Sequence, residues 1–536
     1  MIEEESLVTK SIKIPTTPND LAHGVIDAVG QSNLKLSIPK MFVHGTTIGL
    51  NALLQRKGAK TGLLTTSGFR DVLEIGRTDR PHMYDMRYKK PQPLVPRPLR
   101  LEVTERMNYK GEVITAINED EVRTAVDILS KKGVESIAVC FLHSYANPSH
   151  EEAVGKILKE YPNITHSLSH KIVRSYREYE RTNTTVVDAY LKPMMAAYEG
   201  RLQTNLAKGG FEGTFLITHS SGGAQSAKIA AETPIYTINS GPVGGTIGAS
   251  SIGEIVGLKN LIAVDGGGTS FDVSLISNGH PKVEEQYSVN ELPIMVSVLD
   301  IRSVSAGGGS KAWIDKGGLL RVGPQSAGAD PGPMCYDRSG SEPTVTDAAV
   351  VAGILDLNYF LGGKVKLNEE LAQRGVNKLA STLGMSLLDT AAGIISIAES
   401  NMAETIRETS IEKGYDPREF TIFAYGGSGP MFASHLALDL NVPKLIIPQE
   451  PGNFSAFGML FMDIVYDYSR TFVHDFDASI LQDVNSIFEE LEKEAIESLE
   501  KEGTDPANKI LIRSADVRYV WQEHFINLPF PSGTMS

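Results

Sequence analysis

Residues 262–276, IAVDGGGTSFDVSLI, decide the fold of this chain. An apolar run stops at Asp265, three glycines and Thr269 follow, and polarity alternates from Ser270 onward, which predicts two strands joined by a turn. Glycines let the backbone approach a ligand closely, and the amides of such a turn converge on an anion, most naturally a nucleotide phosphate. Asp265 would hold a metal ion or orient a water beside that anion. A plain glycine-rich turn explains this stretch alone equally well.

The composition is that of a soluble globular protein with more than one domain. A chain of 536 residues exceeds a single hydrophobic core, so two or three domains are predicted. The net charge of −14 argues against nucleic acid or an anionic membrane as the main partner. The two cysteines, Cys140 and Cys335, lack metal-ligand spacing and fit a reducing compartment. Without a signal-peptide pattern or a membrane-spanning apolar run, a cytoplasmic location is expected.

Strand and helix patterns alternate along the chain, which predicts an α/β fold. Strands are expected at 7–14, 40–43, 61–65, 136–142, 214–218, 420–425, 444–447 and 514–528. Helices are expected after a cap at Asn19 or Asp20 and at 51–56, 119–132, 246–255, 386–413, 431–438 and 483–502, with 386–413 the longest.

Residues 67–106 interrupt the alternation with five prolines and six arginines between Arg77 and Arg106. An irregular segment of this length inside a compact protein is usually functional or disordered. The arginines favour recognition of an anionic or carbonyl-rich ligand, and a solvated basic loop is an equally good interpretation.

Glycine-rich turns follow strand ends at 45, 222, 244, 266, 307 and 426. Because ligands of open α/β sheets sit at the carboxyl ends of strands, these turns would face one crevice. The sequence contains no P-loop, no strand leading into a dinucleotide fingerprint, no zinc pattern and no serine-hydrolase elbow.

Eight motifs in order along the chain carry a resemblance to a known family. They are residues 44–77, FLHSYANPSHE (141–151), SGPVGG (240–245), DGGGTSFD (265–272), AGGGS (306–310), GPQSAGADPGPMCY (323–336), TVTDA (344–348) and GGSGP (426–430). Together they resemble the hydantoinase/oxoprolinase family, in its A-type, ATP-binding subunit.

The resemblance implies the actin, hexokinase and Hsp70 fold, in which two RNase H-like α/β domains, one carrying an inserted α/β region, clasp ATP and Mg²⁺. The implied divisions are an N-terminal domain at 1–230, an ATPase-like domain at 231–470 and the start of a C-terminal region at 471–536. Family members usually begin with a first phosphate hairpin, Asp-x-Gly-Gly-Thr-x-Thr-Asp, and continue through a further C-terminal domain. The chain therefore resembles a member incomplete at both ends, and Phe432 stands where many members have His.

The resemblance also assigns site residues. Asp265, Thr269 and Asp272 are expected to be catalytic, with Asp265 also the Mg²⁺ ligand; a hairpin cap is the alternative role for Asp265. The expected ATP-binding residues are Gly266, Gly267, Gly268, Gly244, Gly245, Asn401, Gly426, Gly427, Ser428 and Gly429. The expected substrate residues are His44, Thr46, Thr47, Arg77 and Arg80, although His44 would equally well only order its own loop.

The function that follows is ATP-dependent hydrolysis of a cyclic amide of the hydantoin, 5-oxoproline or lactam type, with a B-type subunit as partner in a homo- or hetero-oligomer. Transfer of a phosphoryl group to the amide oxygen would turn a poor electrophile into a reactive one. Two alternatives remain: a subunit of an acetone or acetophenone carboxylase, and a degenerate protein that binds nucleotide without turnover. Without the first hairpin, these 536 residues alone are expected to show no substrate-dependent ATP hydrolysis.

Overall fold

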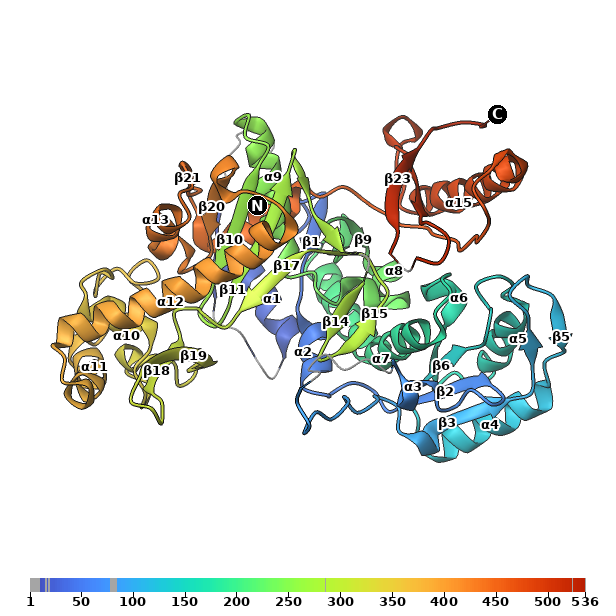
Figure 1. Ribbon diagram of the computed structural model, residues 1–536, viewed down its shortest axis with the longest axis horizontal. Coiled ribbons are helices and arrows are strands. Elements are labelled where there is room, and N and C mark those ends of the chain that lie inside the picture. Colours follow the sequence, from blue (N-terminus) through green and yellow to red (C-terminus); the bar gives the residue numbers. More distant parts are fainter. Residues whose placement is uncertain are drawn as a thin grey trace.

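The computed structural model describes residues 10–14, 17, 20–77, 84–284, 286–522 and 524–535. Figure 1 shows an α/β protein in which the sheet that carries the glycine-rich hairpin lies at one side and a smaller sheet with its own helices lies at the other. The predicted α/β class is confirmed.

The central sheet is built on the hairpin. Its strands lie in the order β12-β11-β10-β20-β21, and β17 also pairs with β11. The hairpin pair and the β11/β17 pair are antiparallel, whereas β10, β20 and β21 are parallel. The strand bounds are β10 Leu261–Gly266, β11 Phe271–Ser277, β12 His280–Pro281, β17 Ile301–Val304, β20 Thr421–Tyr425 and β21 Lys444–Ile446.

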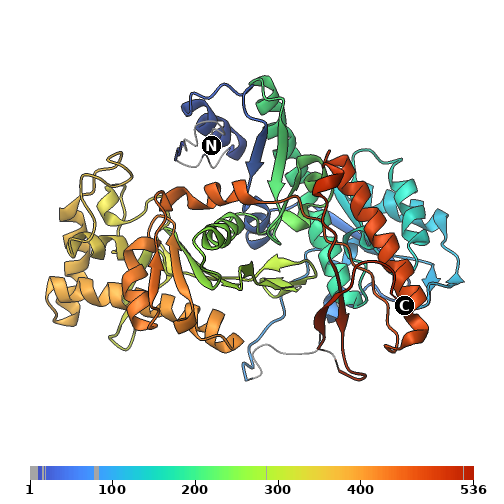
Figure 2. The same cartoon turned by 90° about the horizontal axis from the view of Figure 1, so that it is seen from above.

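Helices cover both faces of this sheet, which is why β10 begins as a continuous apolar run. Ile262 and Val264 pack into the core formed with α10, α11, α12 and α13, and Leu261 and Ala263 pack into the core formed with α9 and α14. Figure 2 shows the short helix α14 (orange) crossing next to α9 (green). The helix bounds are α9 Val243–Ile255, α10 Val345–Val351, α11 Glu369–Leu383, α12 Leu387–Ser410, α13 Gly429–Asp439 and α14 Phe454–Gly458.

A second, three-stranded sheet pairs strands that lie far apart in the sequence. β1 (Met41–His44) is parallel to β8 (Thr214–Thr218), which pairs antiparallel with β9 (Ala224–Ser226). Packed around it are the helices α1 Leu21–Gln31, α2 Ile48–Leu54, α7 Glu178–Lys208 and α8 Ala227–Glu232.

The chain between α2 and α7 forms an inserted lobe, at the lower right of Figure 1. Its four parallel strands lie in the order β3-β2-β6-β7. The elements of the lobe are β2 Thr61–Thr66, α3 Val72–Ile75, β3 Arg100–Val103, β4 Arg106–Met107, β5 Val113–Thr115, α4 Glu119–Lys131, β6 Ser136–Cys140, α5 Ser149–Leu158, β7 Thr165–Leu168 and α6 Ser169–Ile172.

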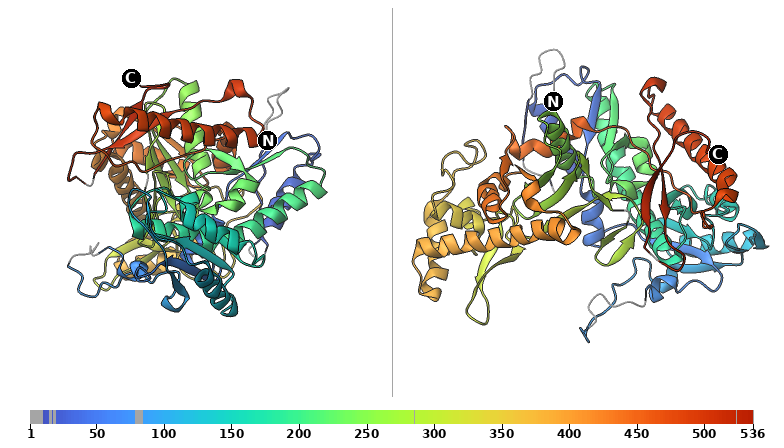
Figure 3. Two further views of the ribbon diagram at one scale, coloured as in Figure 1. Left: turned by 90° about the vertical axis from the view of Figure 1, so that its right-hand side faces the viewer. Right: turned by 45° about the horizontal axis from the view of Figure 1, so that its top comes forward.

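Short hairpins and one long helix complete the described chain. The hairpins pair β13 Val283–Glu284 with β16 Val298–Leu299, β14 Tyr287–Val289 with β15 Leu292–Ile294, β18 Ser310–Ile314 with β19 Leu320–Ser326, and β22 Arg513–Val517 with β23 Ile526–Phe530. Figure 3 shows α15 (Leu481–Lys501) and the last hairpin beside the inserted lobe, where Arg174 donates to Glu494 at 2.8 Å.

Four expectations about the elements were wrong, as far as the described residues test them. The longest helix is α7 with 31 residues and not 386–413, and its amphipathic stripe is missing because residues 180–191 are buried all around. Residues 67–106 are not irregular throughout, because they supply α3 and the sheet strand β3. The expected strand at 514–528 is two strands. Of the expected strand at 7–14, residues 7–9 lie outside the described residues and 10–14 form no strand.

Among the helices of the described residues, none is by itself long and apolar enough to cross a membrane, and α11 with 387–413 meets that test only as a pair bent by 94°. The inner face of α12, including Ile394, Met402 and Ile406, is buried in the core of the central sheet.

Candidate functional site

Four side chains stand in one row across the central sheet. Asp265 on β10 lies opposite Asp272 on β11; Asp272 lies opposite Ser303 on β17, and Asp265 lies beside Tyr425 on β20. Cross-strand partners point to the same face of a sheet, here the face that α9 and α14 cover. The register therefore brings two of the predicted catalytic carboxylates together.

Burial makes both carboxyl groups harder to ionise than an exposed aspartate. Asp265 Oδ2 accepts a hydrogen bond from Ser455 Oγ of α14 at 3.1 Å, and burial raises the pKa of Asp265. Asp272 accepts from Ser303 Oγ, and burial followed by the nearby Asp265 raises the pKa of Asp272 to about 6. Among the described residues neither forms an ion pair. A cation would remove this cost.

Three of the predicted glycine turns meet at the end of this row. The Gly308 amide donates to Gly267 O at 3.1 Å, and Gly309 donates to Gly268 O at 2.6 Å. Ser428 donates through its amide to Gly266 O and through Oγ to Gly267 O, both at 2.8 Å. The turns at 266, 307 and 426 are thus one assembly, as expected of a common crevice.

Two of these glycines are fixed by close backbone approach. A Cβ at Gly266 would lie 2.2 Å from Gly429 N, and a Cβ at Gly426 would lie 2.2 Å from Asp265 Oδ1. Gly426 also has φ +85°, in the left-handed region that favours glycine. The tip of the hairpin is different: Gly268 and Thr269 are exposed, and in the described part of the chain their amides have no acceptor. Those two amides are available to an anion.

The glycine turn before α13 leaves space beside it. Gly427 is exposed, and a Cβ there would meet no atom within 4 Å. The side chain of Asn401 contacts a different element: its Nδ2 donates a hydrogen bond to Val322 O of β19 at 3.4 Å. Its place beside a nucleotide remains a prediction.

Gly244 and Gly245 lie at the start of α9 and are buried by neighbouring elements. A Cβ at Gly244 would lie 2.2 Å from Ser455 O, and a Cβ at Gly245 would lie 2.2 Å from the Tyr425 ring. Close packing of α9 on α14 and β20 therefore accounts for glycine at both positions. Their contact with ATP remains a prediction.

The predicted substrate residues are divided between two places. His44 at the end of β1 pairs through Nε2 with Tyr198 OH at 2.8 Å, and burial lowers the pKa of His44 to about 4, so its ring is neutral. Thr46 exchanges hydrogen bonds with Ser240: its amide donates to Ser240 Oγ at 3.1 Å, and Ser240 Oγ donates to Thr46 O at 2.9 Å. Thr47 precedes α2 as its N-cap residue.

The turn after β1 approaches α9 through η7 (Met459–Phe461). A Cβ at Gly45 would lie 2.3 Å from Met459 Cε, and Met459 also touches the position of Gly244 on α9. Arg77 lies elsewhere, at the start of α7, where its guanidinium donates to both oxygens of Glu180 at 2.7 Å. Arg80 lies outside the described residues.

The arginine-rich segment is largely neutralised by acids of its own region. Arg97 donates to Asp71 at 2.8 Å, and the buried Arg100 donates to Glu74 at 2.9 Å. These two arginines pair with acids of the fold, and the buried Arg100 does not belong to a solvated basic loop.

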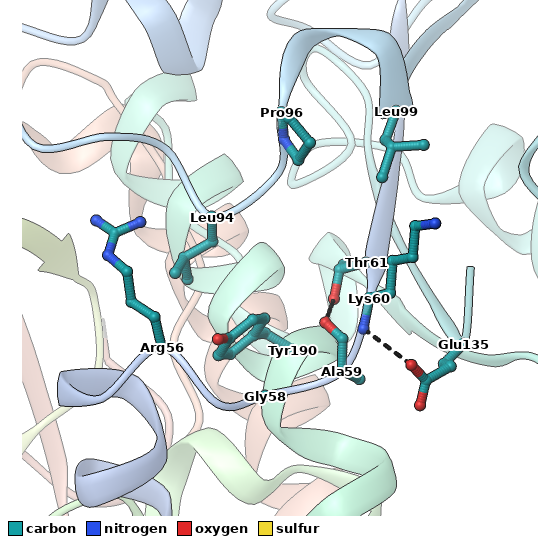
Figure 4. Close-up of a pocket in the computed structure, with 10 residues that line it drawn as sticks. All are labelled: Arg56, Gly58, Ala59, Lys60, Thr61, Leu94, Pro96, Leu99, Glu135 and Tyr190. Atoms are coloured by element: carbon teal, nitrogen blue, oxygen red, sulfur yellow. Dashed lines mark hydrogen bonds between the residues drawn. The ribbon is translucent and has the colours of Figure 1, made fainter. Parts of the chain in front are cut away.

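A cavity of about 390 Å³ lies at the amino end of β2, and none of the predicted site residues lines it (Figure 4). Its wall is the segment that leads from α2 into the inserted lobe, closed by Tyr190 of α7. In this wall the backbone amide of Lys60 donates a hydrogen bond to Glu135 Oε1 at 3.3 Å. The cavity belongs to the junction of the lobe and not to the carboxylate row.

Sequence reasoning missed the two side chains that donate to the carboxylates, Ser303 and Ser455, and their neighbour Tyr425. Ser303 was within reach, because counting along β17 from the glycine turn places it opposite Asp272. Ser455 was not, because α14 reaches the sheet from 190 residues further along the chain.

Among the described residues no group of three or more His, Cys, Asp or Glu side chains is arranged to hold a metal. Mg²⁺ does not require one, since it is usually held by one or two carboxylates together with substrate phosphates and water. The paired carboxylates of Asp265 and Asp272 fit that donor set.

The fold and the site define an α/β protein with a carboxylate pair facing glycine-rich turns. Two family models match it: the hydantoinase/oxoprolinase N-terminal region over residues 1–162 and hydantoinase/oxoprolinase over residues 181–468. The chain belongs to the hydantoinase/oxoprolinase family, whose ATP-dependent enzymes include lactamases, oxoprolinases and carboxylases.

Its relatives are subunits of multi-subunit enzymes. It is 39% identical to the acetophenone carboxylase gamma subunit of Aromatoleum aromaticum, over 86% of this chain and 66% of that one. It is 34% identical to the caprolactamase subunit alpha of Pseudomonas jessenii, over 96% of this chain and 76% of that one. The crystal structure of that ATP-dependent caprolactamase superposes with a TM-score of 0.86 at 33% identity, over 99% of this chain and 79% of that one. Nucleotide-free acetone carboxylase superposes with a TM-score of 0.79 at 29% identity, over 98% and 78%.

Proposed function

We propose that this chain is the nucleotide-binding subunit of an ATP-dependent enzyme that hydrolyses a cyclic amide. The observation that carries the proposal is the pair Asp265 and Asp272 near the amides of Gly268 and Thr269, for which the described residues offer no acceptor. Carboxylates that gain from a cation and amides that gain from an anion lie together, as a magnesium-bound triphosphate requires.

The strand order of the central sheet supports the finer fold assignment. β17, β11 and β10 form an antiparallel run, and β20 and β21 continue it in parallel, which is the order expected of an RNase H-like domain. We extend the proposal to the actin, hexokinase and Hsp70 type, with domains at 1–230 and 231–470 and a C-terminal region from 471.

The chain's own residues would perform the positioning. Asp265, oriented by Ser455, and Asp272, oriented by Ser303, would hold Mg²⁺. Mg²⁺ when bound supplies charge neutralisation, worth several kcal/mol in such reactions. The amides of Gly268 and Thr269 would fix the phosphates, and the space beside Gly427 would admit the adenosine.

The cyclic amide would then gain a leaving group. The bond between the γ-phosphorus and its bridging oxygen breaks, and a bond to the amide oxygen forms, so that ADP departs. Water adds to the activated carbon, and the C–N bond breaks, so that the ring opens to an acyl phosphate and a free amine. A second water then hydrolyses the acyl phosphate to the amino acid and phosphate. Catalysis of this kind depends on positioning and charge neutralisation.

A ketone carboxylase subunit is the second candidate, favoured by the 39% identity to the acetophenone carboxylase gamma subunit. The same site would there phosphorylate an enolate oxygen. The likeness to caprolactamase, with the TM-score of 0.86, favours the amide.

The test is ATP consumption by the chain together with its B-type partner, a subunit that the proposal requires. Hydantoin, 5-oxoproline and caprolactam are compared with acetone and acetophenone supplied with bicarbonate. Stimulation by one cyclic amide supports the proposal, and stimulation by a ketone with bicarbonate replaces it with the second candidate. Binding of ATP without stimulation by any of them would identify a nucleotide-binding protein without turnover.

A further inference from the structure

The inserted lobe has the topology of a ligand-binding sheet of its own. Its parallel strands lie in the order β3-β2-β6-β7, so the chain moves outward in one direction from β2 to β3 and in the other from β6 to β7. In open α/β sheets a ligand binds outside the carboxyl ends of the strands at such a switch point. Here the switch point lies between β2 and β6.

The loops that follow three strands converge at this edge. Thr66, the last residue of β2, accepts the Leu142 amide from the loop after β6 at 2.9 Å, and it donates to Glu105 from the loop after β3. The hairpin that begins at Arg106 leans on the loop after β6, because Asn147 donates to Gly111 O at 2.9 Å.

Arg106 is arranged for a ligand and not for a partner within the protein. Its guanidinium lies over the Phe69 ring at 5.1 Å, and Phe69 sits in the turn directly after β2. Within the described residues Arg106 has no carboxylate at ion-pair distance, unlike Arg97 and Arg100 of the same segment. A contact with an aromatic ring fixes the position of a guanidinium without using its hydrogen-bond donors, which stay available to an anion.

His143 stands beside it in a strained backbone position. It follows β6 with φ +59°, a conformation unusual for a residue with a side chain, and its Nδ1 pairs with Tyr145 OH at 3.1 Å. Burial, then Arg106 and Arg181, lower the pKa of His143, and the exposed Glu178 acts in the opposite direction. The positive charges therefore dominate at this position.

Arg181 of α7 adds a second positive charge near His143. It is 1% exposed, its Nη1 donates to Ser144 and Ser169, and its Nη2 donates to Phe141 O. Its Nη1 also lies 4.0 Å from the buried Glu151 carboxylate. Among the described residues its buried Nε has no hydrogen-bond partner, so the donors of Arg181 are not all satisfied within the protein.

We propose that the carboxyl edge of the inserted sheet binds a small oxyanion, a carboxylate or phosphate group, held by Arg106 with His143 beside it. This site is separate from the carboxylate row, because none of its residues belongs to the central sheet. Two of the motifs of this sequence, 44–77 and 141–151, supply its loops, and the nucleotide site uses neither of these two loops.

The experiment is hydrogen exchange of the full chain with inorganic phosphate or acetate, at constant ionic strength set by sodium chloride. We expect slower exchange in residues 66–70, 104–108 and 141–146. The anion that slows exchange at the lower concentration indicates whether the natural ligand carries a phosphate or a carboxylate group. In Arg106→Gln, the anion concentration needed for half of the full protection should rise at least tenfold. The control Arg123→Gln, which loses only its pairing with Glu160 on the surface of the same lobe, should keep it.

His143→Gln serves as a second variant if Arg106→Gln does not fold, and it too should weaken the effect. The proposal is overturned if neither anion slows exchange in these segments or if the substitutions leave the effect unchanged. Protection confined to the region of Gly268 would place the phosphate in the nucleotide turn and would also overturn it.

Discussion

Asp265 and Asp272 face each other across the glycine hairpin, one strand position before the turn on β10 and one after it on β11. Asp272 acquires a raised pKa partly because Asp265 is its neighbour. Two carboxyl groups held in this way destabilise each other until a cation arrives. The first two predictions follow from that relationship.

Asp265→Asn should lower ATP turnover of the complete enzyme about 100-fold or more, because it removes a charge at the metal and phosphates without changing the side-chain volume. The Ser455 hydrogen bond can persist, so the thermal unfolding temperature should hardly fall. Turnover is measured with the partner subunit, and Asp120→Asn on the exposed surface of α4 is the control. Unchanged turnover with lowered stability would make Asp265 a hairpin cap.

Asp272→Asn should stabilise the fold at pH 8 and not at pH 4. The folded pKa of about 6 lies above the ordinary 3.8, so Asp272 lowers the stability progressively as the pH rises from about 4 to 6, and the loss is complete above that range. Removing the charge should recover about 1–3 kcal/mol at pH 8. Below pH 4 the carboxyl is protonated in both states and the gain disappears.

Denaturant unfolding of parent and variant at the two pH values measures this difference. Ser303→Ala is the companion variant. It deletes a hydrogen bond to the ionised Asp272 carboxylate, so the loss of stability between pH 4 and pH 8 should be larger in this variant than in the parent. An equal effect of Asp272→Asn at pH 4 and pH 8 would contradict the prediction.

Gly427→Val should weaken nucleotide binding without loss of stability. A Cβ at Gly427 meets no protein atom within 4 Å, so the valine is free to occupy the space that the adenosine would enter. Titration with a fluorescent ATP analogue should show at least a tenfold higher Kd. Gly266→Ala is the contrasting variant, since its Cβ would strike Gly429 N at 2.2 Å and the fold should suffer first. Equal affinity of Gly427→Val and parent would move the adenosine elsewhere.

Arg77→Gln should lower stability by about 1–3 kcal/mol, because it leaves the Glu180 carboxylate, only 8% exposed, without its bidentate partner. Glu180→Gln in the same chain should restore most of that loss. Chemical denaturation of the two single variants and the double variant gives the coupling. If the double variant regains stability but its KM for the substrate differs from that of the parent, Arg77 would have a role in substrate binding.

The sequence alone determined the α/β class of the fold and the glycine hairpin on which the proposed nucleotide site is built. The apolar run into Asp265, the glycines and the alternation after Ser270 leave few structures other than the observed hairpin, because strand propensity and turn chemistry are local. The same holds for α1, which begins after the cap Asp20, and for the strand Thr214–Thr218. The ordered motifs also sufficed for the family.

Only the tertiary structure decided which residues hold the carboxylates and which arginines pair with acids. Ser455 lies 190 residues from Asp265, and among the described residues Arg106, unlike Arg97, has no acid at ion-pair distance, so neither fact is written in a local pattern. The helix α7 was underestimated for the same reason, since burial on all sides replaces the stripe that a surface helix displays. Burial, charge pairing and close approach depend on segments that meet only after folding.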